Sequence, residues 1–224
     1  EHEPRLLVTG SQGTGKTVMA EEIIKRFANT RKKILFINSG RLANLVTKSK
    51  YINDYKHISF STFNKFLRDI NIYFNNDISN LPKDFISANN LLSEKAVQLL
   101  NNSTDEKYSY DLIIIDEIQH CYFYDSFYLL LDKILKKGLL EGNYYFFGDF
   151  NYQNIIGEKL SKNILKDRMP KENLQSYEQI TLWHNVRNSE NIAFEAPVIS
   201  GIIEQLPLPY SITKTSGQTE HLFC

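Results

Sequence analysis

Four short segments of this chain carry side chains that could perform phosphate chemistry. The first, residues 10–17, reads Gly-Ser-Gln-Gly-Thr-Gly-Lys-Thr and fits the phosphate-binding pattern G-x-x-x-x-G-K-[ST]. It follows the apolar run 6–8 and precedes a helical periodicity, so it has the strand, loop and helix that this pattern requires. We call residues 10–17 the phosphate loop, and the segment predicts a binding site for ATP.

Each residue type in the phosphate loop suits a phosphate ligand. The glycines let the backbone bend so that amide N–H groups converge on phosphate oxygens at the start of a helix. Lys16 would neutralise the β- and γ-phosphates, and Thr17 would bind Mg²⁺. The bland alternative is a glycine turn with a chance lysine, which the surrounding strand and helix disfavour. The loop residues expected to bind ATP are Gly10, Gly13, Thr14, Gly15, Lys16 and Thr17.

Two carboxylates, Asp116 and Glu117, directly follow the apolar run 112–115. Ligands of open α/β sheets bind at the carboxyl ends of such strands. We expect Asp116 to hold the Mg²⁺ together with Thr17, and Glu117 to orient or activate the attacking water. A solvated acidic turn is the alternative, but the phosphate loop and this acidic pair need the same ion.

Apolar runs of strand length alternate with helical periodicities along most of the chain. The helical stripes lie at 20–27 and 127–135, and this alternation predicts an α/β fold with a mostly parallel sheet. Residues 68–110 are rich in Asn and Ser and read as an insertion with a helix or two, including an amphipathic segment near 91–100. The expected strands are 6–9, 34–37, 58–60, 112–115, 144–147 and 179–182.

Composition limits the remaining possibilities. The chain has 224 residues, with 26 basic and 26 acidic side chains, so no global positive field indicates a nucleic-acid partner. Two cysteines, Cys121 and Cys224, are too few for a disulfide framework or a zinc cluster and suit a reducing cytosol. The sequence shows no signal peptide or long apolar span, so we expect a cytoplasmic protein with no membrane partner. It starts at Glu1, and we expect it to be a piece of something longer.

The later motifs resemble those of superfamily 1 (UvrD/Rep-like) helicases. Asp-Glu-x-Gln at 116–119 looks like the second motif of that family, Gly-Asp-x-Asn-x-Gln at 148–153 like its third, and Asn-Val-Arg at 185–187 like its Asn-Tyr-Arg motif. Residues 34–45 and 61–66 are similar to segments that contact single-stranded nucleic acid. The resemblance covers nearly the whole chain, with the motifs in the family's order.

The resemblance implies specific roles for three more residues. Gln119 and Gln153 would couple the γ-phosphate to the nucleic-acid side, and Arg187 would contact the γ-phosphate. A guanidinium or amide there stabilises charge that grows in the transition state. The alternatives are ordinary loop hydrogen bonds for the two glutamines and a surface charge for Arg187.

The resemblance also implies an architecture and partners. Residues 1–195 would form a RecA-like P-loop ATPase lobe with helices on both faces of the sheet and a small helical insertion. Residues 196–224 would be the connector toward a missing second RecA-like lobe. The expected ligands are ATP and Mg²⁺, the expected partner is single-stranded nucleic acid, DNA in preference to RNA, and the isolated lobe would hydrolyse ATP slowly.

One departure from the family leaves a second function open. Unwinding members carry a tryptophan that stacks on a base after the third motif, whereas this chain has Ile-Gly-Glu-Lys at 156–159. Trp183 is a conceivable substitute, although a single tryptophan at a strand end is more typical of a core. The alternative function is a nucleotide-gated switch that does not unwind strands. Five basic residues could line a phosphate path near the carboxyl edge of the sheet or form a solvated face: Lys48, Lys50, Lys56, Lys65 and Arg68.

Overall fold

The computed structural model describes residues 5–38, 56–121, 126–149, 177–189 and 210–213. The strands are β1 (Arg5–Gly10), β2 (Ile34–Asn38), β3 (Ile58–Thr62), β4 (Leu112–Ile115), β5 (Asn143–Gly148), β6 (Glu178–Leu182), β7 (His184–Ser189) and β8 (Tyr210–Thr213). The α-helices are α1 (Lys16–Ala28), α3 (Phe63–Tyr73), α4 (Phe85–Asn101), α5 (Phe127–Ile134) and α6 (Gly138–Glu141). Two short 3₁₀ helices are η1 (Glu106–Tyr108) and η2 (Ile118–Cys121).

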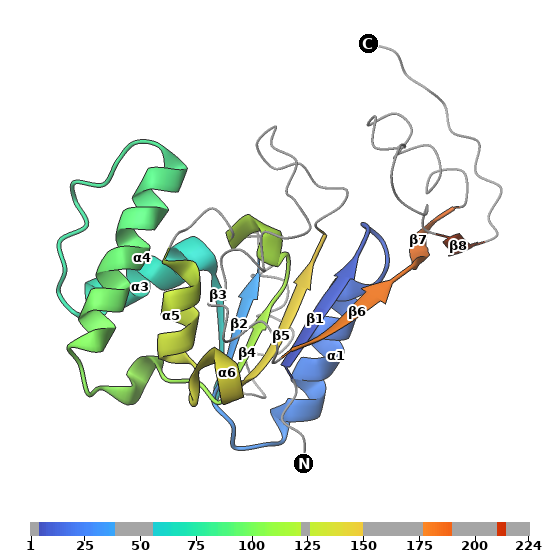
Figure 1. Cartoon of the computed structure of the whole chain (residues 1–224), viewed down its shortest axis with the longest axis horizontal. Coiled ribbons are helices and arrows are strands. Elements are labelled where there is room, and N and C mark those ends of the chain that lie inside the picture. Colours follow the sequence, from blue (N-terminus) through green and yellow to red (C-terminus); the bar gives the residue numbers. More distant parts are fainter. Residues whose placement is uncertain (1–4, 39–55, 122–125, 150–176, 190–209, 214–224) are drawn as a thin grey trace, which may run out of the picture.

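Six strands form one parallel sheet in the order β3-β2-β4-β5-β1-β6 (Figure 1). The sequence therefore predicted the α/β class and all six strands correctly, each to within about two residues. The carboxyl ends of all six strands meet at one edge of the sheet. β7 and β8 pair with each other in a separate two-stranded sheet.

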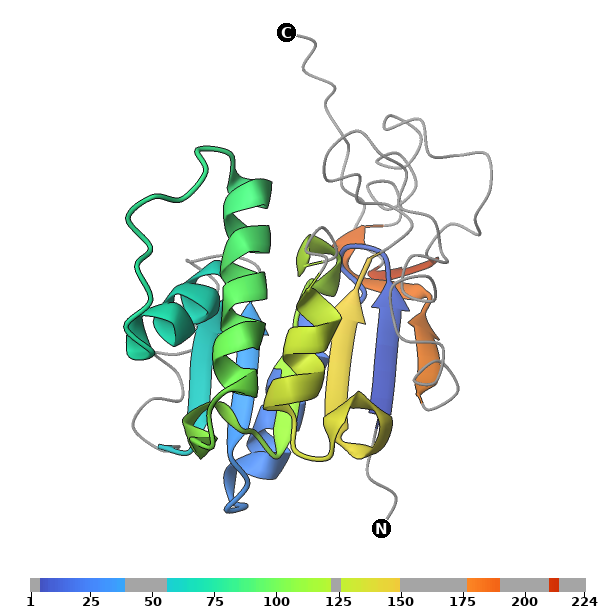
Figure 2. The ribbon, with the colours of Figure 1, turned by 60° about the vertical axis from the view of Figure 1, so that its left-hand side comes forward.

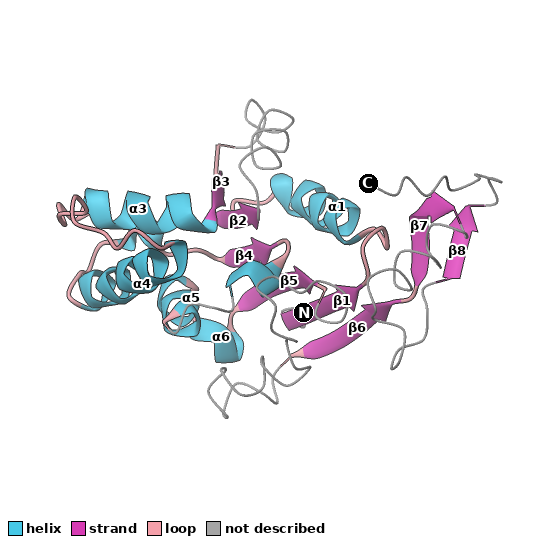
Figure 3. Ribbon diagram, turned by 90° about the horizontal axis from the view of Figure 1, so that it is seen from above, coloured by secondary structure: helices cyan, strands magenta, loops and turns pink. Residues whose placement is uncertain are grey.

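Helices cover both faces of the six-stranded sheet. One face packs against α1, and the other packs against α3, α4, α5 and α6 (Figures 2 and 3). The sequence of β2 is apolar throughout because both of its faces are buried. Ile34 and Phe36 pack in the core beneath α1, while Leu35 and Ile37 pack in the core on the opposite face of the sheet. This burial on two faces explains the unbroken apolar runs that identified the strands.

Side-chain caps fix where two of the helices begin. Thr62 Oγ1 accepts a hydrogen bond from the Lys65 N–H at 3.3 Å at the start of α3, and Asp84 Oδ1 accepts one from the Ser87 N–H at 2.8 Å at the start of α4. The two helices are joined by Asn71, whose buried amide donates to the Leu92 carbonyl at 3.0 Å. Both helices contribute to the same core as the strands.

The segment predicted to be an insertion is mostly helical. The helix expected near 91–100 is the second half of α4, while α3 begins at residue 63, before the predicted segment. The division into lobe, insertion and connector stays a prediction, and β8 lies within the expected connector. In the part of the chain that the structure describes, no helix is both long enough and apolar enough to cross a bilayer.

Candidate active site

The phosphate loop connects β1 to α1 and has a backbone that requires glycine. Gly13 and Gly15 have φ of +88° and +93°, a region that other L residues rarely adopt. A Cβ on Gly10 would lie 2.7 Å from Thr14 Oγ1 and 2.9 Å from the Leu182 carbonyl oxygen. Both contacts are shorter than van der Waals distance, so these glycines cannot be exchanged without moving the loop.

Lys16 is the first residue of α1 and is nearly buried, with 5% of its surface exposed. Its ammonium group donates to the Gly10 carbonyl at 2.7 Å and to the Ser11 carbonyl at 3.0 Å. These two bonds hold the charge within the loop instead of leaving it in solvent. The charge is thus placed among the backbone groups that the pattern assigns to phosphate binding.

Thr17 and Asp116 meet although 99 positions separate them. Thr17 Oγ1 donates to Asp116 Oδ2 at 2.7 Å. Asp116 is 5% exposed, and its other oxygen, Oδ1, has no hydrogen-bond partner among the described residues. The structure therefore brings together, at the carboxyl edge of the sheet, the two side chains predicted to share one ion, and their binding of Mg²⁺ stays a prediction.

The pKa of Asp116 is raised to about 6, because burial and, to a smaller extent, the charge of Glu117 outweigh the Thr17 hydrogen bond and the Lys16 charge, which lower it. A buried carboxylate with one oxygen lacking a partner suits a hard divalent cation, because Mg²⁺ prefers oxygen ligands and commonly takes one or two carboxylates with water and phosphate. The residues present therefore fit Mg²⁺.

Gln119 links the acidic pair to the end of β5. It is fully buried, its amide group donates to Glu117 Oε2, and its carbonyl accepts the Asp149 N–H at 3.1 Å. Glu117 has φ of +60°, an uncommon conformation for a residue with a side chain. The second motif and the start of the third are thus in contact. Gln153 lies outside the described residues, so its predicted role stays a prediction.

Asn185 makes contacts that the sequence did not predict. Its side-chain amide donates to the Gln12 carbonyl at 3.1 Å, the neighbouring Val186 N–H donates to the Gly13 carbonyl at 2.9 Å, and Asn185 itself is 2% exposed. A Cβ on Gly13 would lie 2.6 Å from Asn185 Oδ1. The start of β7 therefore holds the phosphate loop directly.

Arg187 and Trp183 both lie on the surface near this contact. The backbone N–H of Arg187 donates to Asn185 Oδ1 at 3.0 Å, and Arg187 is exposed to solvent. Its predicted contact with the γ-phosphate stays a prediction. Trp183 is 47% exposed, so the expectation of a core position was wrong. It is the single residue between β6 and β7.

Comparisons with known proteins add a family match. A family model described as "Type III restriction enzyme, res subunit" matches residues 1–165. One similar solved structure is the Pif1 helicase from Bacteroides, determined with ADP-AlF3 and ssDNA, at 17% identity and a TM-score of 0.40. That match covers 81% of this chain and 38% of that one. No curated protein matches the chain.

Proposed function

Because the chain belongs to the family described as "Type III restriction enzyme, res subunit", we propose that it is an ATP-hydrolysing motor lobe acting on single-stranded nucleic acid, with DNA as the preferred track. Membership in this family supports a RecA-like helicase lobe, as the sequence motifs predicted. The finer assignment to superfamily 1 rests on those motifs. The observation that carries the proposal is the bond between Thr17 Oγ1 and Asp116 Oδ2.

The proposed Mg²⁺ ligands are the two side chains of that bond. Thr17 Oγ1 would turn its lone pairs to the ion, and Asp116 would reach it directly or through water. The bound ion would neutralise charge on the β- and γ-phosphate oxygens. Lys16 would exchange its carbonyl partners for phosphate oxygens, since a charge-assisted bond to an anion is stronger than one to a neutral carbonyl.

Glu117 is the proposed general base or water-orienting residue. Its carboxylate already accepts a hydrogen bond from Gln119, which in turn bonds the backbone of Asp149. Movement at the end of β5 would therefore reach Glu117 through a single side chain. This link supports the proposal that Gln119 couples the γ-phosphate to the nucleic-acid side.

The experiment that tests the proposal combines ATP binding by this chain with ATP turnover by the longer protein that carries the second lobe implied by the resemblance, each measured with and without single-stranded DNA or RNA. We expect Mg²⁺-dependent ATP binding that Lys16→Ala abolishes, and turnover that one polynucleotide stimulates and Glu117→Gln abolishes. Val18→Ala is a matched control, because Val18 is on α1 beside these residues and is 71% exposed.

Two results would change this conclusion. ATP binding that is insensitive to Lys16→Ala would refute the assignment of the phosphate loop. Turnover that no polynucleotide alters would refute the motor and favour the nucleotide-gated switch, in which the same ATP site controls partner binding.

A further inference from the structure

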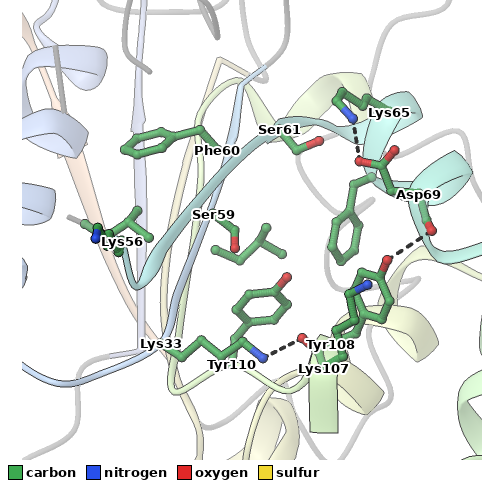
Figure 4. Close-up of a pocket in the computed structure, with 13 residues that line it drawn as sticks. Lys33, Lys56, Ser59, Phe60, Ser61, Lys65, Asp69, Lys107, Tyr108 and Tyr110 are labelled. Carbon is green, nitrogen blue, oxygen red and sulfur yellow. Dashed lines mark hydrogen bonds and ion pairs between the residues drawn. The ribbon is translucent and has the colours of Figure 1, made fainter. Parts of the chain in front are cut away.

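A second concave site lies at the opposite edge of the sheet from β1 and β6. It is a cavity of about 640 Å³ beside the edge strand β3, between that strand, α3 and η1 (Figure 4). Four strand spacings separate β3 from β1, which at about 4.8 Å each is about 19 Å. The volume lies within the range of small-molecule sites, about 300–1,000 Å³. We call this cavity the β3 pocket.

The β3 pocket has an excess of positive charge in a chain whose total charge is zero. Four lysines line it, against one carboxylate, Asp69. They come from different parts of the chain, and Figure 4 shows them at separate points around the space: Lys33, Lys56, Lys65 and Lys107. Two of them, Lys56 and Lys65, belong to the basic set noted in the sequence. That set was expected near the carboxyl edge of the sheet, but Lys56 lies before the amino end of β3.

Two of these lysines are placed to receive an anion. Lys56 is exposed at the rim, and the Lys107 ammonium lies 3.5 Å from the centre of the Tyr73 ring. This contact uses no conventional hydrogen bond, but the Asp105 carboxylate lies near Lys107. A hydrogen bond from the Tyr73 hydroxyl lowers the pKa of Asp105 and the charge of Lys107 helps to lower it, so a phosphate at Lys107 would compete with Asp105. Lys65 bonds Asp69 at 2.6 Å, and Lys33 donates to the Glu106 carbonyl at 3.0 Å.

Burial and the nearby Lys136 lower the pKa of Lys33, against three neighbouring carboxylates that raise it. An anion in the pocket would offset the cost of keeping this ammonium charged.

Aromatic rings and hydroxyl groups make the rest of the wall. Tyr108 and Tyr110 are 8% and 3% exposed, and Phe66 lies at 5.9 Å and 6.2 Å from them between ring centroids. Figure 4 shows the Ser59 hydroxyl directed into the middle of the space, toward the Tyr110 ring. An apolar wall with a few hydroxyl groups and a basic rim matches a planar base with an attached phosphate.

We propose that the β3 pocket binds a nucleotide, with its base in the cavity beside Tyr108 and Tyr110 and its phosphate at Lys56; in a strand, a neighbouring phosphate would lie at Lys107, on the other side of the cavity in Figure 4. The nucleotide is either free or part of a single strand that leaves the carboxyl edge of the sheet beside Lys65. The strand as its source rests on the proposed function, whereas the chemistry of the pocket does not.

The test uses the full 224-residue chain carrying Lys16→Ala, so that the phosphate loop does not contribute. Fluorescence anisotropy measures binding of a labelled oligothymidylate of about ten nucleotides, a length within known single-strand site sizes. Unlabelled thymidine 5′-monophosphate is the competitor. The test variant combines Lys56→Gln with Lys107→Gln, and Lys83→Gln is the matched control, an exposed lysine outside the pocket.

We expect the double variant to bind both probes more weakly than the control. For a strand, loss of two phosphate contacts should reduce the salt slope by about 1.4, so that the parent loses about sevenfold more affinity than the variant between about 50 and 200 mM salt. Lys56→Gln alone should give about half of that change in slope, and it guards against misfolding of the double variant, which thermal unfolding checks. Competition by the monophosphate identifies a free nucleotide as a ligand, and binding of the oligonucleotide alone identifies a strand.

Three results would overturn the β3 pocket. The first is a double variant that binds both probes as tightly as Lys83→Gln does, and the second is no binding of either probe. The third is displacement of oligothymidylate by polyglutamate as effectively as by nucleotide. Oligonucleotide binding that the pocket substitutions leave unchanged would refute this site alone and leave the motor standing. Binding of the monophosphate that depends on the pocket lysines, together with turnover that no polynucleotide stimulates, would support the β3 pocket and refute the motor.

Discussion

Neutralising Asp116 should stabilise the protein in the absence of metal, although the residue belongs to the proposed active site. Burial first, and the charge of Glu117 second, raise the pKa of Asp116 from 3.8 to about 6. A folded-state pKa above the unfolded value means that the native state binds more protons between these two values. Stability therefore falls as the pH rises from about 4 to about 6 and stays low above it.

The magnitude follows from the same two values. The interval between 3.8 and about 6 corresponds to about 3 kcal/mol at neutral pH and above, and about 1 kcal/mol is already lost at about pH 4.5. Asp116→Asn removes the charge and keeps an oxygen to accept the Thr17 hydrogen bond. The free energy of unfolding of the variant relative to the wild type should thus increase by about 2 kcal/mol between about pH 4.5 and pH 8.

Urea denaturation in a chelator, followed by circular dichroism at both pH values, measures this difference. Asp111→Asn is the control that should show almost no pH dependence in this range. Burial alone would raise the pKa of Asp111, but bonds from Lys136 and from the Lys33 N–H lower it overall, so the stability that this carboxylate adds is lost only below about pH 4, and the difference between wild type and Asp111→Asn should stay nearly constant between the two pH values. A wild-type to Asp116→Asn difference that is constant or shrinks with pH would show that the carboxylate is not destabilised by its site.

Three further predictions concern the phosphate loop and its neighbours. Gly13→Ala should weaken ATP binding at least about a hundredfold, because φ of +88° and a contact of 2.6 Å with Asn185 Oδ1 exclude a Cβ; ordinary affinity in equilibrium binding would contradict this. Asn185→Ala should weaken ATP binding about tenfold, since it leaves the Gln12 carbonyl without its donor at a cost of about 1–2 kcal/mol, and calorimetry that finds unchanged affinity would contradict it. Glu117→Gln should bind ATP normally while single-turnover hydrolysis slows at least about a hundredfold, and near-normal hydrolysis would remove Glu117 from the mechanism.

The strands and the paired motifs could be predicted because their signals are local. A run such as Ile34–Asn38 is apolar on both faces because both faces are buried, and this pattern is visible without the fold. Thr17 and Asp116 could be paired in advance because each follows a strand, and the carboxyl ends of parallel strands share one edge. Their chemistry then predicted a common ion, Mg²⁺.

Asn185 could not be assigned to the phosphate loop from local signals. Its contact depends on the register between β1 and β6, in which Gly10 pairs with Leu182. That register carries the chain past residue 182 to the side of residues 11–14, where Asn185 meets the Gln12 carbonyl. The same reason applies to the β3 pocket, whose Lys33 and Lys107 come from segments that only the sheet order brings together.

The proposed active site has three features that destabilise the folded lobe in the absence of ligands. Asp116 is held ionised only at a cost, Lys16 is buried with neutral carbonyls as its hydrogen-bond partners, and Glu117 has a backbone conformation that few side chains adopt. The first two of these costs fall when a cation and a phosphate arrive, because the carboxylate gains a positive ligand and the ammonium a negative one. Mg²⁺ and ATP together should therefore stabilise the wild type far more than they stabilise Asp116→Asn, and this difference separates a binding site from a merely strained strand end.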